Sequence, residues 1–142
     1  MATLCIDTAT ADGMVVVARE HGPTAAARWR SSGRHGENLF GHMEAALREA
    51  GVSRDEISLI GVSIGPGGFT SLRVGVATAK GLALGLDRPI VGVSSLRVVA
   101  RSIEGDSGIA RVPVASSYRG DVFAAAYLID GDAVTELVPP AL

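Results

Sequence analysis

A glycine-rich loop between two apolar segments is the stretch of this sequence best placed to do chemistry. The loop GPGGFTS (residues 65–71) follows the apolar run 57–64 and precedes the segment 71–86, which is rich in Ala, Val and Leu. A strand, a loop and a helix in this order can bind an anion, because free backbone N–H groups and the positive end of the helix dipole favour an oxyanion. The same layout also serves as a tight turn before a packed helix, so two interpretations are open.

The known phosphate-binding patterns do not match this loop. A P-loop ends in Gly-Lys-Ser/Thr, whereas Gly68-Phe69-Thr70 offers no lysine to a phosphate. A dinucleotide fingerprint requires an acidic residue on a second strand about 20 residues later, and Pro89 stands there instead. Phe69 is expected to anchor the loop on a neighbouring surface. The structural interpretation of the loop is therefore preferred.

Candidate metal ligands and catalytic groups give a weaker signal. His35, Glu37, His42 and Glu44 are close in sequence, but the zincin pattern His-Glu-x-x-His is absent. No Ser-His-Asp or Cys-His pattern stands out either. We expect no catalytic residue and no metal ligand, with His35 at a helix start and His42 in solvent.

The composition describes a globular chain without a strong electrostatic character. It has 142 residues, 47% of them hydrophobic and 20% charged, and a formal net charge of -2, so no global basic field favours nucleic acid. Its apolar runs are interrupted before they could cross a bilayer, and no export signal opens the chain. The one cysteine, Cys5, forbids an internal disulfide and fits a reducing compartment. These features predict a cytoplasmic protein without a membrane segment.

Two groups of strands frame the chain and suggest two lobes. Alternating and apolar segments predict strands at 2–7, 14–18 and 25–30, and again at 112–115, 122–129 and 133–138. Repetition of the same order of elements indicates a duplicated architecture. We expect a first lobe at 1–106 and the start of a second, truncated lobe at 107–142. Its three-stranded sheet needs a cover for its apolar face, which this stretch does not provide.

The segment between the two groups predicts helices at 35–50, 71–86 and 96–103, and strands at 57–64 and 90–93 that run parallel to the first. Helix 71–86 is apolar nearly all round and contains several glycines, each of which costs about 1 kcal/mol against alanine. A second body packed closely on this helix would explain both properties, whereas packing on the sheet of the same lobe would explain close approach on one face only. The predicted partner-binding residues are Leu39, Phe40, Met43, Leu47, Ser71, Arg73, Val74, Gly75, Thr78, Ala79 and Leu82.

Several motifs in this order closely resemble the TsaB family, formerly YeaZ. They are IDTAT (6–10), HGE (35–37), the loop from Gly65 to Gly75, AKGLA (79–83), GVSSL (92–96) and RGDVF (119–123). The resemblance implies an α/β fold of the actin-like ATPase and ribonuclease-H-like type, with three antiparallel strands extended by parallel strands with helices, and an incomplete second lobe. Ser116 and Ser117 depart from the family, which often has an acidic residue before the Arg-Gly turn.

The same resemblance implies a non-catalytic scaffold in tRNA threonylcarbamoyladenosine formation at position 37, in a family once classed with the M22 glycoproteases. Its implied partners are the catalytic paralogue TsaD and the ATPase TsaE, with tRNA contacted only indirectly and a possible homodimer through helices 35–50 and 71–86. The alternative is an ATPase or phosphotransferase that binds Mg-ATP; a metallopeptidase is a distant third. For Asp7, Thr8 and Thr10 the competing interpretation is ordinary turn chemistry. The residues of a vestigial nucleotide site would be Asp7, Thr8, Thr10, Gly67, Gly68 and Thr70.

Overall fold

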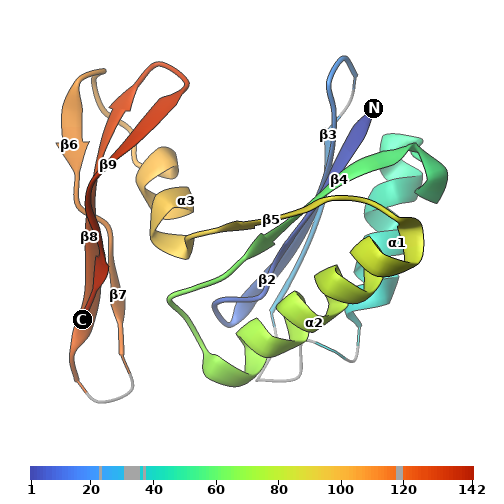
Figure 1. Cartoon of the computed structure of the whole chain (residues 1–142), viewed down its shortest axis with the longest axis horizontal. Coiled ribbons are helices and arrows are strands. Elements are labelled where there is room, and N and C mark those ends of the chain that lie inside the picture. The colour runs from blue at the N-terminus through green and yellow to red at the C-terminus, as the bar shows by residue number, and fades with distance from the viewer. Residues whose placement is uncertain (23, 31–35, 37, 118–119) are drawn as a thin grey trace. The chain divides into compact units, whose positions relative to one another are not determined.

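The computed structural model describes residues 1–22, 24–30, 36, 38–117 and 120–142 (Figure 1). The expectations for His35, Glu37 and Arg119 lie outside the described residues. Within the described part of the chain, no helix is long and apolar enough to cross a membrane.

The described chain forms two compact units. The first comprises residues 1–64 and 68–92, and the second comprises residues 65–67 and 93–142. The expected boundary at 106/107 differs from this division, because the helix that follows residue 93 packs in the second unit.

The first unit contains a five-stranded sheet in the order β3-β2-β1-β4-β5. Its strands are β1 (Ala2–Asp7), β2 (Asp12–Arg19), β3 (Thr24–Arg30), β4 (Ile57–Ser63) and β5 (Ile90–Val93). β2 pairs antiparallel with both β1 and β3, whereas β4 pairs parallel to β1. Three antiparallel strands extended by a parallel one agree with the predicted sheet.

Helices α1 (Leu39–Ala50) and α2 (Phe69–Leu86) belong to the first unit (Figure 1). Alternate residues of β1, such as Leu4 and Ile6, share one core with apolar residues of both helices, so the helices cover one face of the sheet. α1 ends at Gly51, whose φ of 61° lies in the left-handed region that glycine favours at a helix end. A short 3-10 turn, η2 (Arg54–Glu56), leads into β4.

α2 begins two residues earlier than the predicted 71–86. Gly68 is its N-cap in an extended conformation, and no side chain caps the helix. Thr70 and Ser71 therefore lie inside the first turn, where the Ser71 hydroxyl donates to the Gly68 carbonyl at 3.0 Å. The loop 65–68 makes the turn, as predicted, but the helix start depends on backbone conformation rather than on the two hydroxyls.

The sheet of the second unit has β8 (Val122–Asp130) as its central strand. β6 (Ile109–Arg111) and β7 (Val114–Ser116) pair antiparallel with successive parts of β8, and β9 (Ala133–Ala141) also pairs with it. The single predicted strand 112–115 is therefore two short strands, separated around Pro113, which has no N–H to donate to the ladder. β9 continues three residues past the predicted end through two prolines, which an edge strand tolerates.

Helix α3 (Ser95–Ser102) supplies the cover that the second sheet was expected to lack. Leu96 and Ala100 of α3 share a buried core with Ala125, Tyr127 and Ile129 of β8. Arg111 is buried beside the end of α3, where its guanidinium donates to the carbonyls of Ala100 at 3.2 Å and Gly105 at 3.0 Å. The last carbonyls of a helix lack partners within the helix, so Arg111 supplies a hydrogen-bond donor to the C-terminal end of α3.

Candidate functional site

A groove between α1 and α2 is the part of the first unit best suited to receive another molecule. The cavity measures about 260 Å³. We call it the helix groove; its lining residues are Phe40, Met43, Glu44, Leu47, Arg54, Gly81, Leu82, Gly85 and Leu86. Glu44 and Arg54 form an exposed ion pair at 2.7 Å within this lining. An apolar groove with a charged pair at its edge resembles the apolar centre and polar rim of protein interfaces.

Apolar side chains of both helices extend into solvent. Phe40 of α1 is 57% exposed and Leu84 of α2 is 87% exposed. Leu84 lies eleven residues after Arg73, which is close to three helical turns, so both belong to one exposed stripe that also contains Ala77 and Lys80. Gly81 and Gly85 line the groove and have open space where a Cβ would be.

The predicted partner-binding residues divide into three groups by exposure. Phe40 and Arg73 are exposed, whereas Ser71, Val74, Thr78 and Leu82 are half-buried. The buried group consists of Leu39, Met43, Leu47, Gly75 and Ala79. Most of the buried group lies in the core of the first unit, so these side chains hold the helices on their own sheet and offer little surface to a second body.

Leu84 is a surface residue that the sequence reasoning missed. The signal that could have found it is its helical spacing from Arg73 and Lys80, the two charged residues within the predicted helix. Charged residues mark the solvent side of a helix, and Leu84 falls on that side.

Phe69 does not anchor the loop on a neighbouring surface as predicted. Its side chain is 67% exposed, and the guanidinium carbon of Arg73 lies 4.0 Å from the centre of its ring. The two residues are one helical turn apart in α2, which brings a cation over an aromatic face. Phe69 and Arg73 thus form a pair on the surface of the helix.

The residues proposed for a nucleotide site make the hydrogen bonds of ordinary turns. An Asp7 carboxylate oxygen accepts the Ala9 N–H at 2.9 Å. The Thr10 hydroxyl donates to the Asp12 carbonyl at 3.0 Å and accepts the Asp12 N–H at 3.2 Å. These contacts are those expected of Asp and Thr beside a hairpin turn.

The turn after β1 and the start of α2 are joined directly. The buried Thr8 hydroxyl donates to the Ser71 carbonyl at 2.7 Å, and the Gly68 N–H donates to the Ala9 carbonyl at 2.8 Å. Of the remaining nucleotide candidates, Thr70 is exposed, and Gly67 belongs to the second unit. The structure thus brings Thr8 and Gly68 into one contact region with α2.

His42 is half-buried and is not the solvated residue that was predicted. Its ring stacks on Trp29 of β3, with ring centres 4.4 Å apart and planes inclined by 6°. This stack lies between α1 and the sheet. Among the described residues, no group of three or more His, Cys, Asp or Glu is arranged to hold a metal ion.

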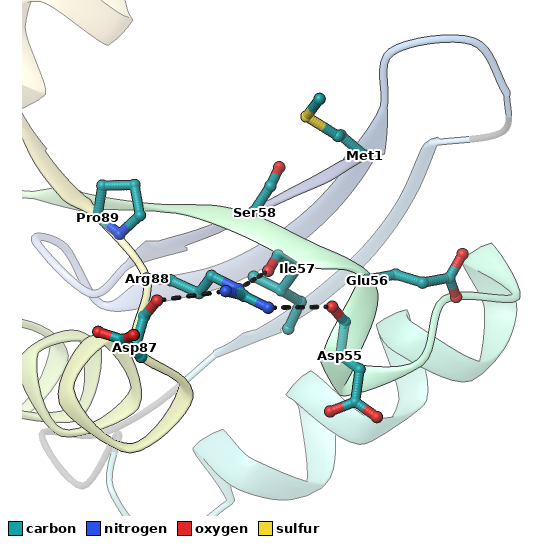
Figure 2. Close-up of a pocket in the computed structure, with 8 residues that line it drawn as sticks. All are labelled: Met1, Asp55, Glu56, Ile57, Ser58, Asp87, Arg88 and Pro89. Carbon is teal, nitrogen blue, oxygen red and sulfur yellow. Dashed lines mark hydrogen bonds between the residues drawn. The ribbon is translucent and has the colours of Figure 1, made fainter.

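A second pocket of about 380 Å³ lies at the start of β4 (Figure 2). Arg88 crosses it and donates to the backbone carbonyls of Ile57 at 2.7 Å, Asp87 at 3.3 Å and Asp55 at 3.5 Å. Hydrogen bonds from the N–H and hydroxyl of Ser53 hold the pKa of Glu56 below its ordinary value. Through these hydrogen bonds to backbone carbonyls, Arg88 joins η2, β4 and the end of α2.

Comparison with known proteins places these features in a family context. The family model described as "TsaD: tRNA N6-adenosine threonylcarbamoyltransferase" matches residues 29–142. The tRNA threonylcarbamoyladenosine biosynthesis protein TsaB of Escherichia coli K12 is 34% identical over 135 residues, which cover 94% of this chain and 58% of that protein. TsaB of Bacillus subtilis 168 is 30% identical over 139 residues, which cover 98% and 60%. The chain thus spans about three fifths of the length of these relatives.

Matches to the transferase itself are shorter. The tRNA N6-adenosine threonylcarbamoyltransferase of Clostridium beijerinckii is 46% identical over 63 residues, which cover 44% of this chain and 19% of that enzyme. Among solved structures, YeaZ from Pseudomonas aeruginosa superposes with a TM-score of 0.89 at 24% identity, over 99% of this chain and 66% of that one. The full-length matches to TsaB confirm the predicted resemblance, and the family model together with the superposition on YeaZ confirms the predicted actin-like α/β fold.

Proposed function

Because the chain belongs to the family described as "TsaD: tRNA N6-adenosine threonylcarbamoyltransferase" and matches TsaB proteins over almost its whole length, we propose that it is a non-catalytic scaffold for N6-threonylcarbamoyladenosine formation at position 37 of tRNA. In this role it binds a TsaD-like catalytic partner and contacts tRNA only through that partner, in the cytoplasm. The resemblance adds a TsaE-like ATPase as a third component.

The observation that carries this proposal is the exposed apolar surface of the first unit. Phe40 lines the helix groove and Leu84 extends from α2, and both expose most of their side chains to water. Leu84 lies on the exposed stripe of α2, outside the groove lining, and exposed apolar surface of this kind is typical of interaction sites. Gly81 and Gly85 leave room for a partner helix to approach the backbone of α2. In the absence of the partner, two copies of the chain pair through the same surface.

A matched pair of substitutions tests the docking surface. Leu84→Glu places a charge on the proposed surface, and Leu137→Glu places the same charge on an exposed leucine of β9 in the second unit. We expect Leu84→Glu to raise the Kd for the TsaD-like protein of the same organism more than about tenfold, as for an interface hot spot. Leu137→Glu should change it by less than about threefold, because β9 is not part of the proposed docking surface.

Isothermal titration calorimetry gives the Kd, and sedimentation equilibrium of the free variants gives the self-association constant. Leu84→Glu should weaken both the binding of the TsaD-like protein and the self-association of the chain. Equal Kd values for the two variants would contradict docking through α1 and α2, and a wild type that stays monomeric at high concentration would contradict the homodimer.

We further propose that the chain works without a bound nucleotide. The Asp7 carboxylate accepts the Ala9 N–H and the Thr8 hydroxyl donates to the Ser71 carbonyl, so both side chains already have partners within the chain. Titration of the chain with Mg-ATP in a calorimeter is expected to give no heat beyond dilution. A saturable binding isotherm that disappears in Asp7→Asn would instead support the ATPase interpretation.

A further inference from the structure

The buried hydroxyl of Thr8 makes a contact that neither the groove nor the turn requires. Thr8 follows the last residue of β1, and its side chain is only 1% exposed. Its Oγ1 donates to the carbonyl oxygen of Ser71 in the first turn of α2, at 2.7 Å. A buried hydroxyl needs a hydrogen-bond partner, and this one finds it on the helix that carries Leu84.

Gly75 lies one helical turn beyond Ser71 and packs on the same side chain. A Cβ built on Gly75 would overlap Thr8 Oγ1, and it would lie 3.5 Å from both Thr8 Cβ and Thr8 Cγ2. The hydrogen bond and the close packing therefore depend on each other, because only a residue without a side chain lets Thr8 reach the helix. The Gly68 N–H adds a second hydrogen bond, to the Ala9 carbonyl at 2.8 Å.

These contacts join the inner side of α2 to the end of β1, while the exposed stripe lies on the opposite side of the same helix. At 100° per residue, Gly75 and Ala79 point to the sheet when Arg73 and Leu84 point to solvent, in agreement with their burial. Side-chain atoms lie roughly 5–6 Å from a helix axis, so a rotation of about 20° would move the exposed stripe by about 2 Å. Complementary packing at an interface does not tolerate such a shift.

We propose that Thr8 is a positioning residue for docking: its bond to Ser71, with Gly75 beneath it, fixes the rotation and axial position of α2 and so pre-forms the surface that carries Leu84. The inference rests on the proposed function, because it assigns to Thr8 a role in the same docking surface. Pre-forming a binding surface raises affinity because less ordering is needed on association.

The test compares Thr8→Val with Thr8→Ser. Valine keeps the shape of the side chain and removes the donor, whereas serine keeps the donor and loses a methyl group. Ile129→Val, at a buried position in the second unit, is a control for a modest loss of core packing away from α2. Calorimetry with the TsaD-like protein measures the Kd of each variant at a temperature at which circular dichroism shows all of them folded.

We expect Thr8→Val to raise the Kd about tenfold, with Thr8→Ser and Ile129→Val within about threefold of the wild type. Rescue by serine separates positioning from a general loss of stability. Wild-type affinity of Thr8→Val overturns the inference. If Leu84→Glu still weakens binding in that case, the proposed function stands; if Leu84→Glu also binds normally, docking through α2 fails and the inference fails with it.

A double variant keeps the inference testable if Thr8→Val does not fold. Thr8→Ala combined with Gly75→Ala removes the hydroxyl that a Cβ at 75 would overlap and fills the space with a methyl group, so packing is kept without the hydrogen bond. Weakened docking by this folded variant, with faster amide hydrogen exchange in the first turns of α2, supports the inference. Normal docking by it overturns the inference.

Discussion

Gly75 in the first half of α2 and Gly81 in its second half are the same residue type in one helix, but their surroundings differ. Gly75 is buried against Thr8, and a Cβ there would overlap the threonine hydroxyl. Gly81 is exposed in the lining of the helix groove, and a Cβ there would meet nothing within 4 Å. One side of α2 is thus shaped by the unit's own sheet, whereas the side that carries Gly81 is open to solvent.

The comparison shows that small residues in one helix can be needed for different reasons. For Gly75, Ala79, Gly81 and Gly85 the sequence reasoning preferred the close approach of a second body over packing on the sheet of the same lobe. Gly75 and Ala79 are accounted for inside the first unit, by Thr8 and by the core respectively. Only Gly81 and Gly85 remain open to the original explanation.

The largest expected effect is that of Gly75→Ala. Forcing a methyl group against the Thr8 hydroxyl should lower the free energy of unfolding by about 2–3 kcal/mol, the upper range for overpacking of a core. Urea denaturation followed by circular dichroism measures this change. A stability equal to that of the wild type would mean that α2 shifts freely on β1, and the contrast between the two glycines would not hold.

Gly81→Ala is expected to act in the opposite direction. Alanine in an exposed helix interior should raise the free energy of unfolding by about 0.5–1 kcal/mol, because glycine leaves the unfolded chain more freedom and no neighbour obstructs the methyl group. The same urea experiment applies. Gly41→Ala in α1, where a Cβ also meets nothing within 4 Å, is a matched control with the same expected sign. Destabilisation by Gly81→Ala would indicate contacts on the outer side of α2.

The smallest expected effect concerns the C-terminal end of α2. Asp87 is its C-cap in the left-handed region, with φ of 53°, and its carboxylate lies at the negative end of the helix dipole. Asp87→Asn keeps a residue that tolerates this conformation and removes the charge, so stability should rise by about 0.3–1 kcal/mol at low salt. The gain should shrink in 1 M NaCl, because salt screens exposed charges. A gain that does not depend on salt would point to a cause other than the dipole.

Much of the fold follows from short-range patterns. The strands of the first unit were predicted because the alternation of apolar and polar residues acts over a few positions. The strand 112–115 was placed wrongly because its division at Pro113 depends on pairing with β8. The cover of the second sheet was missed because the packing of α3 on β8 joins residues far apart in the chain.

The candidate site was less predictable than the fold. Helices 35–50 and 71–86 were predicted as a partner-binding pair; residues of both line one groove, but five of their eleven predicted residues are buried. Phe69 and His42 were assigned the wrong surroundings, because the first pairs with Arg73 on the surface and the second stacks on Trp29. Helical periodicity separates two faces of a helix but does not say which face the sheet covers when both are apolar.

The sequence by itself determined the family, the order of the elements and the absence of a P-loop pattern, because each of these depends on the identity and spacing of residues close together in the chain. The tertiary structure alone decided that Thr8 meets Ser71 and Gly75, which lie 63 and 67 residues further along the chain. That contact depends on how α2 is rotated on its sheet, and the rotation is set by packing between distant segments.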